Sequence, residues 1–446
     1  MLASQGRYFL KYYPQHMILL SLLVSTCLGT LLLALPIARV SYIPLIDLFF
    51  TATSLTTVTG ILTVSIDQFT SFGQVIMLCL MQLGGIGLMT LSLCFIYMFS
   101  NLGIYTQVIA SEILSLKSFK DTKQTLFFII KLTLCTELLG ALIIFPTMYD
   151  QYPLKKALFF SVFHSVSSFC NAGFSLFPDK LIEFNHNPLM LYTTTILMII
   201  GGLGFVTWHE LINKYWTHRA GPKIISWHTK LVLRMYLSTA LVSGILFWML
   251  ERHHTLLHMS GLQKLSFIIF TSISIKSTGF VLVSFATVQL ATLILTMITM
   301  FIGSAPLSTG SGIKTSVFSI YMAVIKAAIQ GKRHAMLYQR HIVDDQVYKA
   351  MAIIALSLSW IVLITFCLLI TESRWDFVDI LFGTVSAFSN NGILISPAHY
   401  LTTIGKCFMV VSMFIGRIGA LAIILSIKRI GDLRDISYPK EHVILG

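Results

Sequence analysis

Four short segments of this 446-residue chain share a phenylalanine, a run rich in Ser and Thr, and a terminal glycine. The glycines are Gly60, Gly173, Gly279 and Gly392, at intervals of 113, 106 and 113 residues. Glycine adopts positive φ at little steric cost, so neighbouring carbonyl groups can turn toward a common axis. A ring of carbonyl oxygens can replace the hydration shell of a dehydrated monovalent cation. The segments therefore predict a cation filter made of main-chain oxygens.

Each predicted filter segment consists of the glycine and the two residues before it. These are Val58, Thr59 and Gly60; Asn171, Ala172 and Gly173; Ser277, Thr278 and Gly279; and Asn390, Asn391 and Gly392. No ring of acidic side chains occurs at these positions, which disfavours a divalent-selective pore. One glycine per segment predicts fewer stacked ion sites and less stringent selection. Lys276 stands beside the third segment, and we expect its ammonium group to snorkel away or to pair with an acid.

A second glycine pattern follows each filter segment inside a long apolar run. Its four copies are Met81–Leu88, Met198–Phe205, Met300–Leu307 and Met413–Ala420. The first glycine of each copy lies 24, 28, 24 and 24 residues beyond the filter glycine. Two patterns in register through four copies indicate an internal repeat. For Gly84, Gly201, Gly416 and their neighbours we expect a packing role between helices.

Each repeat combines a long apolar helix, a short polar helix and a second long apolar helix. The expected elements are 16–36, 43–57 and 73–100; 124–148, 153–170 and 186–213; 228–250, 260–276 and 285–329; and 347–371, 376–389 and 403–428. The middle runs are too short to cross about 30 Å of hydrocarbon, so we expect them to re-enter from outside. The predicted fold is an all-α polytopic membrane protein of four helix–pore-loop–helix repeats, with about eight transmembrane helices and four re-entrant pore helices around a central pore. The organisation is an N-terminus (1–15), repeats 16–100, 124–213, 228–329 and 347–428, and a C-terminal tail (429–446).

Composition agrees with a membrane protein. The chain is 56% hydrophobic and 11% charged, against roughly 25% charged in soluble proteins. Its formal net charge is +13, but 20 of the 31 Lys and Arg residues fall on one set of loops and 8 on the alternate set. This distribution predicts cytoplasmic termini and argues against nucleic-acid binding, which favours one compact basic domain.

The third repeat carries a candidate gate in its second helix. Three glycines, a proline and four hydroxyls interrupt an apolar run, and a helix does not continue through them. The predicted gate residues are Gly303, Ser304, Ala305, Pro306, Ser308, Thr309, Gly310, Ser311, Gly312 and Lys314, together with Arg417 at the equivalent level of the fourth repeat. A guanidinium at membrane depth is costly, and its five donors could hold the loop's carbonyls. A structural tie between helices is the alternative for Arg417, and the two roles are compatible.

Glu137 is the one carboxylate near the middle of a predicted crossing helix. A lone acid argues against a proton-coupled carrier, which usually has chains of such residues. We expect a hydrogen-bonded structural acid there.

The elements T-V-T-G, N-A-G-F, S-T-G-F and N-N-G-I, with G-S-A-P-L-S-T-G-S-G-I-K and F-I-G-R-I-G, resemble the Trk/Ktr/HKT superfamily of potassium transporters. The tail Tyr438–Gly446 and the segment His228–Leu231 are similar to the ion-translocating membrane subunit of a bacterial Ktr system. Sodium-permeating plant members have serine in place of the first filter glycine, so Gly60 implies potassium. The resemblance also implies that the loop at 303–314 is an intramembrane gate, in which Pro306 departs from the usual small residue.

The resemblance further implies a multi-pass protein of the plasma membrane, with sodium-stimulated uptake. It implies a homodimer joined partly through the C-terminal tail. Cytosolic nucleotide-binding regulatory subunits of the RCK type would touch the loops 101–123, 214–230 and 330–349. No nucleotide is expected on this chain itself, because Gly84-Gly85-Ile86-Gly87 lies within an apolar helix rather than after a strand.

Three functions other than selective potassium uptake make different predictions for the sequence. An intramembrane enzyme is disfavoured because no G-x-S-x-G, H-E-x-x-H or paired intramembrane carboxylate occurs. A non-transporting assembly subunit would not need four filter glycines. A weakly selective potassium/sodium channel stays open, since sequence does not separate channel-like flux from ion-coupled uptake.

Overall fold

The computed structural model describes residues 14–98, 120–177, 181–215, 225–257 and 259–419. The predicted C-terminal dimer contact (429–446), most of the N-terminus (1–15) and most of the loop 101–123 lie outside these ranges.

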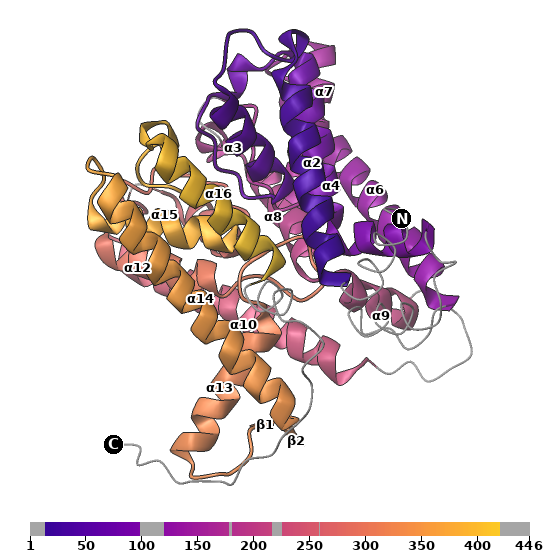
Figure 1. The fold of residues 1–446 in the computed structure, drawn as a ribbon, viewed down its shortest axis with the longest axis vertical. Coiled ribbons are helices and arrows are strands. Elements are labelled where there is room, and N and C mark those ends of the chain that lie inside the picture. The colour runs from indigo at the N-terminus through magenta and orange to yellow at the C-terminus, as the bar shows by residue number, and fades with distance from the viewer. Residues whose placement is uncertain (1–13, 99–119, 178–180, 216–224, 258, 420–446) are drawn as a thin grey trace, which may run out of the picture.

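The described chain is a bundle of helices that follows the predicted repeat (Figure 1). Each repeat begins with a long helix, continues with a short one, and ends with a third. The first two repeats contain α2 (Pro14–Ala34), α3 (Leu45–Thr56) and α4 (Ser71–Met98), then α6 (Lys120–Tyr149), α7 (Leu154–Phe169), α8 (Pro188–Gly202) and α9 (Phe205–Tyr215). The last two contain α10 (Trp227–Glu251), α11 (Gly261–Ser277), α12 (Leu290–Phe301) and α13 (Thr315–Ile329), then α14 (Asp344–Thr371), α15 (Phe377–Ser389) and α16 (Thr403–Ile418). Short 3-10 turns connect them at Pro36–Ala38, Ile66–Gln68, Ile182–Phe184 and Ala398–Tyr400.

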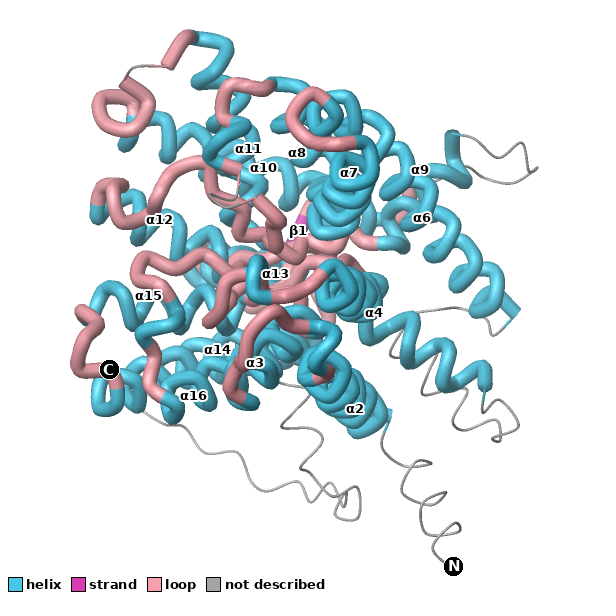
Figure 2. Tube along the Cα trace, turned by 90° about the horizontal axis from the view of Figure 1, so that it is seen from above, coloured by secondary structure: helices cyan, strands magenta, loops and turns pink. Residues whose placement is uncertain are grey.

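Among the described residues, three helices and one bent pair of helices have the length and hydropathy of membrane spans. Phe127–Tyr149, Trp227–Glu251 and Asp344–Thr371 each qualify alone, and α8 with α9 qualifies as one bent pair; only the described residues enter this comparison. The short helices α3, α7, α11 and α15 have 12 to 17 residues, which is too few to cross the hydrocarbon. Viewed from above, the helices surround a centre filled by loops (Figure 2).

The second helix of repeat 2 differs from the prediction of one helix over 186–213. It breaks after Gly202, and α8 and α9 meet at an angle of 100°. Gly204 has φ +84°, a conformation that favours glycine, and a Cβ there would overlap the carbonyl oxygen of Pro306. The loop of repeat 3 packs at this bend, where the N–H of Phe205 donates to the carbonyl of Leu307 at 2.9 Å.

A two-stranded hairpin within the loop 330–349 was not predicted. Strand β1 (Met336–Leu337) pairs antiparallel with β2 (Arg340–His341). Its two turn residues, Tyr338 and Gln339, have positive φ, as the two-residue turns of hairpins require. The guanidinium of Arg234 on α10 stacks 4.6 Å from the centre of the Tyr338 ring and holds the hairpin against the bundle.

In repeats 3 and 4 a buried carboxylate connects the end of the first helix to the start of the third. Glu251, at the end of α10, accepts the main-chain N–H of Gln289 at 3.0 Å and the hydroxyl of Thr292 at 2.5 Å. Glu372, after α14, accepts the main-chain N–H and the hydroxyl of Thr402, the residue that caps α16. Each carboxylate thus satisfies free N–H groups at the start of the repeat's next long helix.

A buried ion pair joins the first repeat to the fourth. The ammonium of Lys406 on α16 lies 2.6 Å from a carboxylate oxygen of Asp47 in the first turn of α3, and both side chains are nearly buried. Removing one member of such a pair leaves an uncompensated charge, whereas replacing both by apolar groups does not.

The Asp47–Lys406 pair gives the first prediction. Asp47→Asn should lower the free energy of unfolding by about 3 kcal/mol. The double variant Asp47→Leu/Lys406→Leu should recover most of that loss. Thermal melting of the detergent-purified proteins provides the measurement, and equal melting of the single variant and the wild type would contradict the assignment.

Candidate functional site

The four filter glycines form a closed ring of contacts. A Cβ built on Gly60 would overlap the carbonyl oxygen of Ala172, and one on Gly173 that of Thr278. A Cβ on Gly279 would overlap Asn391, and one on Gly392 would overlap Thr59, each at its carbonyl oxygen. All four overlaps are closer than 3.0 Å, and all four glycines have φ between +70° and +90°. The structure therefore brings the predicted segments together in the cyclic order of the sequence, at positions that exclude any side chain.

The ends of the short helices aim these segments at the ring. In repeats 1, 2 and 4 a left-handed residue reverses the chain two positions before the glycine: Val58, Asn171 and Asn390 have φ of 58°, 56° and 50°. The following N–H then bonds back to a carbonyl five residues earlier, as from Thr59 to Ser54 at 2.8 Å. This is the helix ending that satisfies free terminal carbonyls.

The third repeat ends differently. The segment from Phe270 to Gly279 is one residue shorter than its three counterparts, and no left-handed residue precedes its glycine. Helix α11 continues to Ser277, and the N–H of Gly279 itself bonds to Ser274 at 3.1 Å. Each repeat contributes one quarter of the ring, and the quarters are numbered as the repeats. The third quarter therefore differs from the other three, which are similar.

Side chains bind neighbouring quarters of the ring to each other. The carboxamide oxygen of Asn171 accepts the hydroxyls of Ser277 at 3.1 Å and Thr278 at 2.5 Å. The amide of Asn391 donates to the carbonyl of Ile275 at 2.9 Å, and that of Asn390 donates to the hydroxyl of Thr59 at 2.8 Å. These bonds fix the register of three of the four junctions.

In repeats 2, 3 and 4 one serine hydroxyl binds the strand at or beyond the ring glycine, a role that the sequence analysis did not assign, whereas the hydroxyl of the equivalent Ser54 in repeat 1 has no hydrogen-bond partner. Ser167 and Ser274 donate to the carbonyls of Phe174 and Phe280 at 2.7 and 2.6 Å. Ser386 accepts the N–H of Gly392 at 3.0 Å. The sequence carried a signal for this role, because all four segments have a serine four residues after the phenylalanine: Ser54, Ser167, Ser274 and Ser386.

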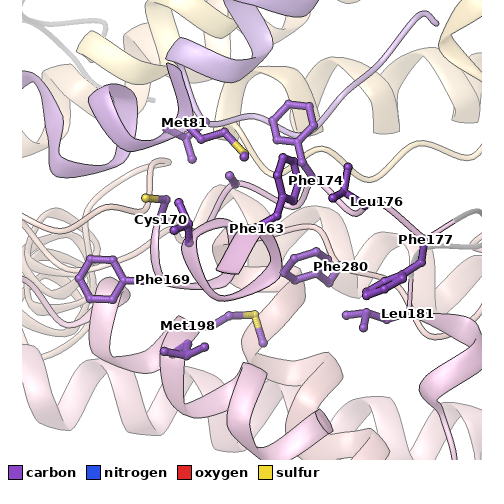
Figure 3. Close-up of a cluster of buried hydrophobic side chains, with 14 of the residues drawn as sticks. Met81, Phe163, Phe169, Cys170, Phe174, Leu176, Phe177, Leu181, Met198 and Phe280 are labelled. Carbon is purple, nitrogen blue, oxygen red and sulfur yellow. The ribbon is translucent and has the colours of Figure 1, made fainter. Parts of the chain in front are cut away.

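Apolar packing surrounds the second quarter (Figure 3). Phe174 and Phe280, which directly follow two of the ring glycines, are buried in one cluster with Phe163, Met81 and Met198. The packing leaves the strands little freedom to widen, because a core at native density does not deform continuously.

A cavity of about 410 Å³ lies beside the ring, on the side of the strands that follow its glycines. It is lined by the strands after three of the glycines, at 60–67, 173–177 and 392–399. Asp67, one of its lining residues, contributes a carboxylate, and Asp379 accepts the hydroxyl of Ser396 at its edge. Acidic groups at such a mouth enrich cations near it.

The first glycine of the second pattern packs against the end of a short helix in repeats 1, 2 and 4, as predicted, whereas Gly419 has nothing within 4 Å of a Cβ. A Cβ on Gly84, Gly201 or Gly416 would overlap the terminal carbonyl region of α3, α7 or α15, at Thr56, Phe169 and Phe388 respectively. In repeat 3 the equivalent Gly303 instead lies against the carbonyl of Ser311. The packing prediction is confirmed for these three glycines.

All ten predicted loop residues of the candidate gate lie between α12 and α13, in the segment 303–314. The loop docks on the end of α8: the N–H groups of Ala305 and Thr309 donate to the carbonyls of Gly202 and Gly201, both at 3.1 Å. A Cβ on Gly310 would lie 3.0 Å from the side chain of Ser277, so the loop touches the third quarter of the ring. Ser308 donates within the loop to Ala305 at 2.6 Å, and Pro306 lies against Gly204.

Thr309 connects this loop directly to the ring. Its hydroxyl donates to the carbonyl of Phe169, the last residue of α7, at 3.1 Å. The same hydroxyl accepts the amide of Asn171 at 2.7 Å.

Arg417 ties the loop to two other repeats. Its guanidinium donates to the carbonyl of Thr309 at 2.6 Å, to the hydroxyl of Ser311 at 2.8 Å, and to the carbonyl of Gly84 on α4. One side chain of repeat 4 thus binds repeats 1 and 3. Lys314, the last of the predicted gate residues, donates to the carbonyl of Gly310 at 2.7 Å within the same loop.

Lys276, in the last turn of α11, is buried against α10. Its ammonium donates to the hydroxyl of Thr239 at 2.7 Å and to the carbonyl of Tyr236 at 3.3 Å, and lies 3.8 Å from the centre of the Tyr236 ring. Neither predicted alternative is found: the side chain is fully buried rather than snorkelling to the surface, and within the described residues no carboxylate pairs with it. The helix C-terminus and the aromatic face take that place.

Glu137 is a hydrogen-bonded acid, as predicted. Its carboxylate accepts the amide of Gln82 at 3.0 Å, and the thiol of Cys170 lies 3.9 Å away. Its own carbonyl accepts the hydroxyl of Ser165 at 2.6 Å. The residue binds α6 to α4 and to the end of α7.

Residues 21–431 of the chain match the profile of a family described as TrkH, cation transport protein. The chain belongs to this family. Ktr system potassium uptake protein B of Bacillus subtilis (strain 168) is 32% identical to it over 442 residues, covering 98% of each chain. The protein of the same name from Vibrio alginolyticus is 34% identical over 438 residues, covering 97% of this chain and 94% of its own. These proteins are transporters and not enzymes, which excludes the alternative of an intramembrane enzyme.

Two further comparisons extend the match. The potassium/sodium uptake protein NtpJ of Enterococcus hirae is 30% identical over 409 residues, covering 90% of each chain. The crystal structure of the potassium transporter TrkH from Vibrio parahaemolyticus superposes with a TM-score of 0.71 at 18% identity, over 93% of this chain and 85% of that one. This TrkH-family chain therefore has the TrkH fold, including its pore-loop repeats.

Glycine packing in this TrkH-family protein gives the second prediction. Gly416→Ala should destabilise the protein by about 1–3 kcal/mol, because its Cβ overlaps a main-chain carbonyl that cannot move aside easily. Gly261→Ala is the matched control, since nothing lies within 4 Å of its Cβ. The two melting temperatures make the comparison, and equal stability of both variants would contradict the packing.

Proposed function

We propose that this chain takes up potassium across the cell membrane through a four-repeat carbonyl filter gated by the loop 303–314. The observation that carries the proposal is the closed contact of Gly60, Gly173, Gly279 and Gly392, with a main-chain carbonyl of the next repeat at every junction. Relatives that cover almost the whole chain are potassium uptake proteins by name, which supports potassium as the ion.

A cation would enter from the cavity beside the ring, where Asp67 contributes negative charge. The four short helices end at the ring, so their partially negative C-terminal ends would stabilise an ion there. Carbonyl oxygens of the ring would replace its water. The hydrogen bonds between quarters keep the ring from closing on a smaller ion or opening for a hydrated one.

The loop at 303–314 would block the path below the ring. Arg417 holds the loop by two hydrogen bonds and binds α4 by a third, and Thr309 binds the loop to the end of α7. Opening would break these contacts and move the guanidinium charge out of the cation path. The contacts are few and local, which suits an element with two arrangements.

We further propose a homodimer with cytosolic RCK-type subunits that bind nucleotide, while this chain binds none itself. The loops 101–123, 214–230 and 330–349 would receive them, and both termini would be cytoplasmic. The hairpin β1–β2 gives the third loop a defined shape for such a contact. Sodium-dependent uptake belongs to the same proposal.

A weakly selective potassium/sodium channel is the second candidate function. Two observations favour it: the third quarter of the ring lacks the ending that the other three share, and a potassium/sodium uptake protein is 30% identical to this chain.

Rescue of a potassium-uptake-deficient cell at limiting potassium tests the function. Wild-type chain should restore growth, and Gly279→Asp should abolish uptake, because its side chain would enter the ring. Gly261→Asp is the control on the same helix; it lies in open space at a helix start, where aspartate is favourable. Normal uptake by Gly279→Asp would rule out the filter.

Arg417→Ala tests the gate. The variant loses two hydrogen bonds to the loop and one to α4, so leak flux of potassium should rise in potassium-starved cells. Arg417→Lys, which keeps the charge but not the planar set of donors, should leak less than the alanine variant. Unchanged flux with normal membrane levels would count against a gating role.

A further inference from the structure

Lys276 introduces an electrostatic asymmetry among the four short helices. It lies in the last turn of α11, and α3, α7 and α15 have no basic residue in their last turns. A cation in the last turn offsets the partial negative charge of a helix C-terminus. The end of α11 is therefore less negative than the three other ends that surround the ring.

The structure holds this ammonium close behind the third quarter of the ring. Lys276 is fully buried and precedes Ser277 and Thr278, whose hydroxyls bind Asn171 of the second quarter. Thr239, the carbonyl of Tyr236 and the Tyr236 ring fix its position on α10. In the described part of the chain no carboxylate lies within ion-pair distance of it, so its field is not cancelled locally.

We propose that Lys276 weakens the binding of the transported cation in the ring and so sets the potassium concentration at which uptake is half-maximal. The proposal rests on the proposed uptake function. Conduction requires binding that is favourable enough for entry and weak enough for release. A fixed positive charge behind one quarter lowers affinity without changing the carbonyl oxygens that contact the ion.

The test measures initial rates of potassium uptake against external potassium, in uptake-deficient cells expressing the full chain. Lys276→Met keeps the length of the side chain and removes its charge, and should lower the half-saturating concentration on the order of tenfold. A decrease on the order of tenfold is the effect expected of one unit charge roughly 10 Å from the ion at an effective dielectric of about 20. Lys276→Arg keeps the charge and should stay near the wild-type value.

Lys264→Met is the matched control, because it removes the same charge from the opposite end of the same helix. Its half-saturating concentration should not change. Membrane levels of every variant are measured, and Lys276→Gln is a second neutral variant.

An unchanged or raised half-saturating concentration in both neutral variants overturns the proposal, as does an equal decrease in Lys276→Arg. Loss of both neutral variants from the membrane assigns Lys276 a purely structural role and also overturns it. If the wild-type chain itself fails to restore uptake, the proposed function fails instead, so the two failures are distinguishable.

Discussion

The mutual contact of four glycines is the constraint on which the rest of the structure depends. At each junction of the ring, from Gly60 to Gly173, Gly279 and Gly392, a Cβ would overlap a carbonyl of the next repeat. The short helices must therefore end at one point, and the long helices must leave room behind them. Gly84, Gly201 and Gly416 supply that room against the helix ends. Fold and candidate site are thus consequences of the same close approach.

Departures from fourfold symmetry concentrate in the third repeat. Its segment is one residue shorter, its helix α11 runs closer to the glycine, and its second long helix is interrupted at 303–314. The loop satisfies the free carbonyls at the end of α8 and accepts Arg417, so it is an integral part of the packed centre. The loop contacts repeat 2 directly and is linked through Arg417 to repeats 4 and 1, so it can influence the whole ring, which suits a gate in a chain of the TrkH family.

The sequence predicted the repeat, the filter segments and the interrupted helix because each carries a local signal: a glycine in register, a polar run in apolar surroundings, or a proline. Contacts set by tertiary packing gave no such signal. The α8–α9 bend at Gly204 packs against the loop of another repeat. Lys276 contacts an aromatic face, a hydroxyl and one carbonyl instead of an acid. The Asp47–Lys406 pair joins residues 359 positions apart, which spacing alone does not reveal.

The most direct test of the central claim is crystallographic localisation of rubidium by anomalous scattering, in protein crystals grown with that ion as a potassium substitute. The account predicts a peak on the axis of the ring, surrounded by the carbonyl oxygens of Thr59, Ala172, Thr278 and Asn391. Rubidium bound elsewhere in a transport-competent protein, with the four glycine segments apart and no shared path between them, would contradict it.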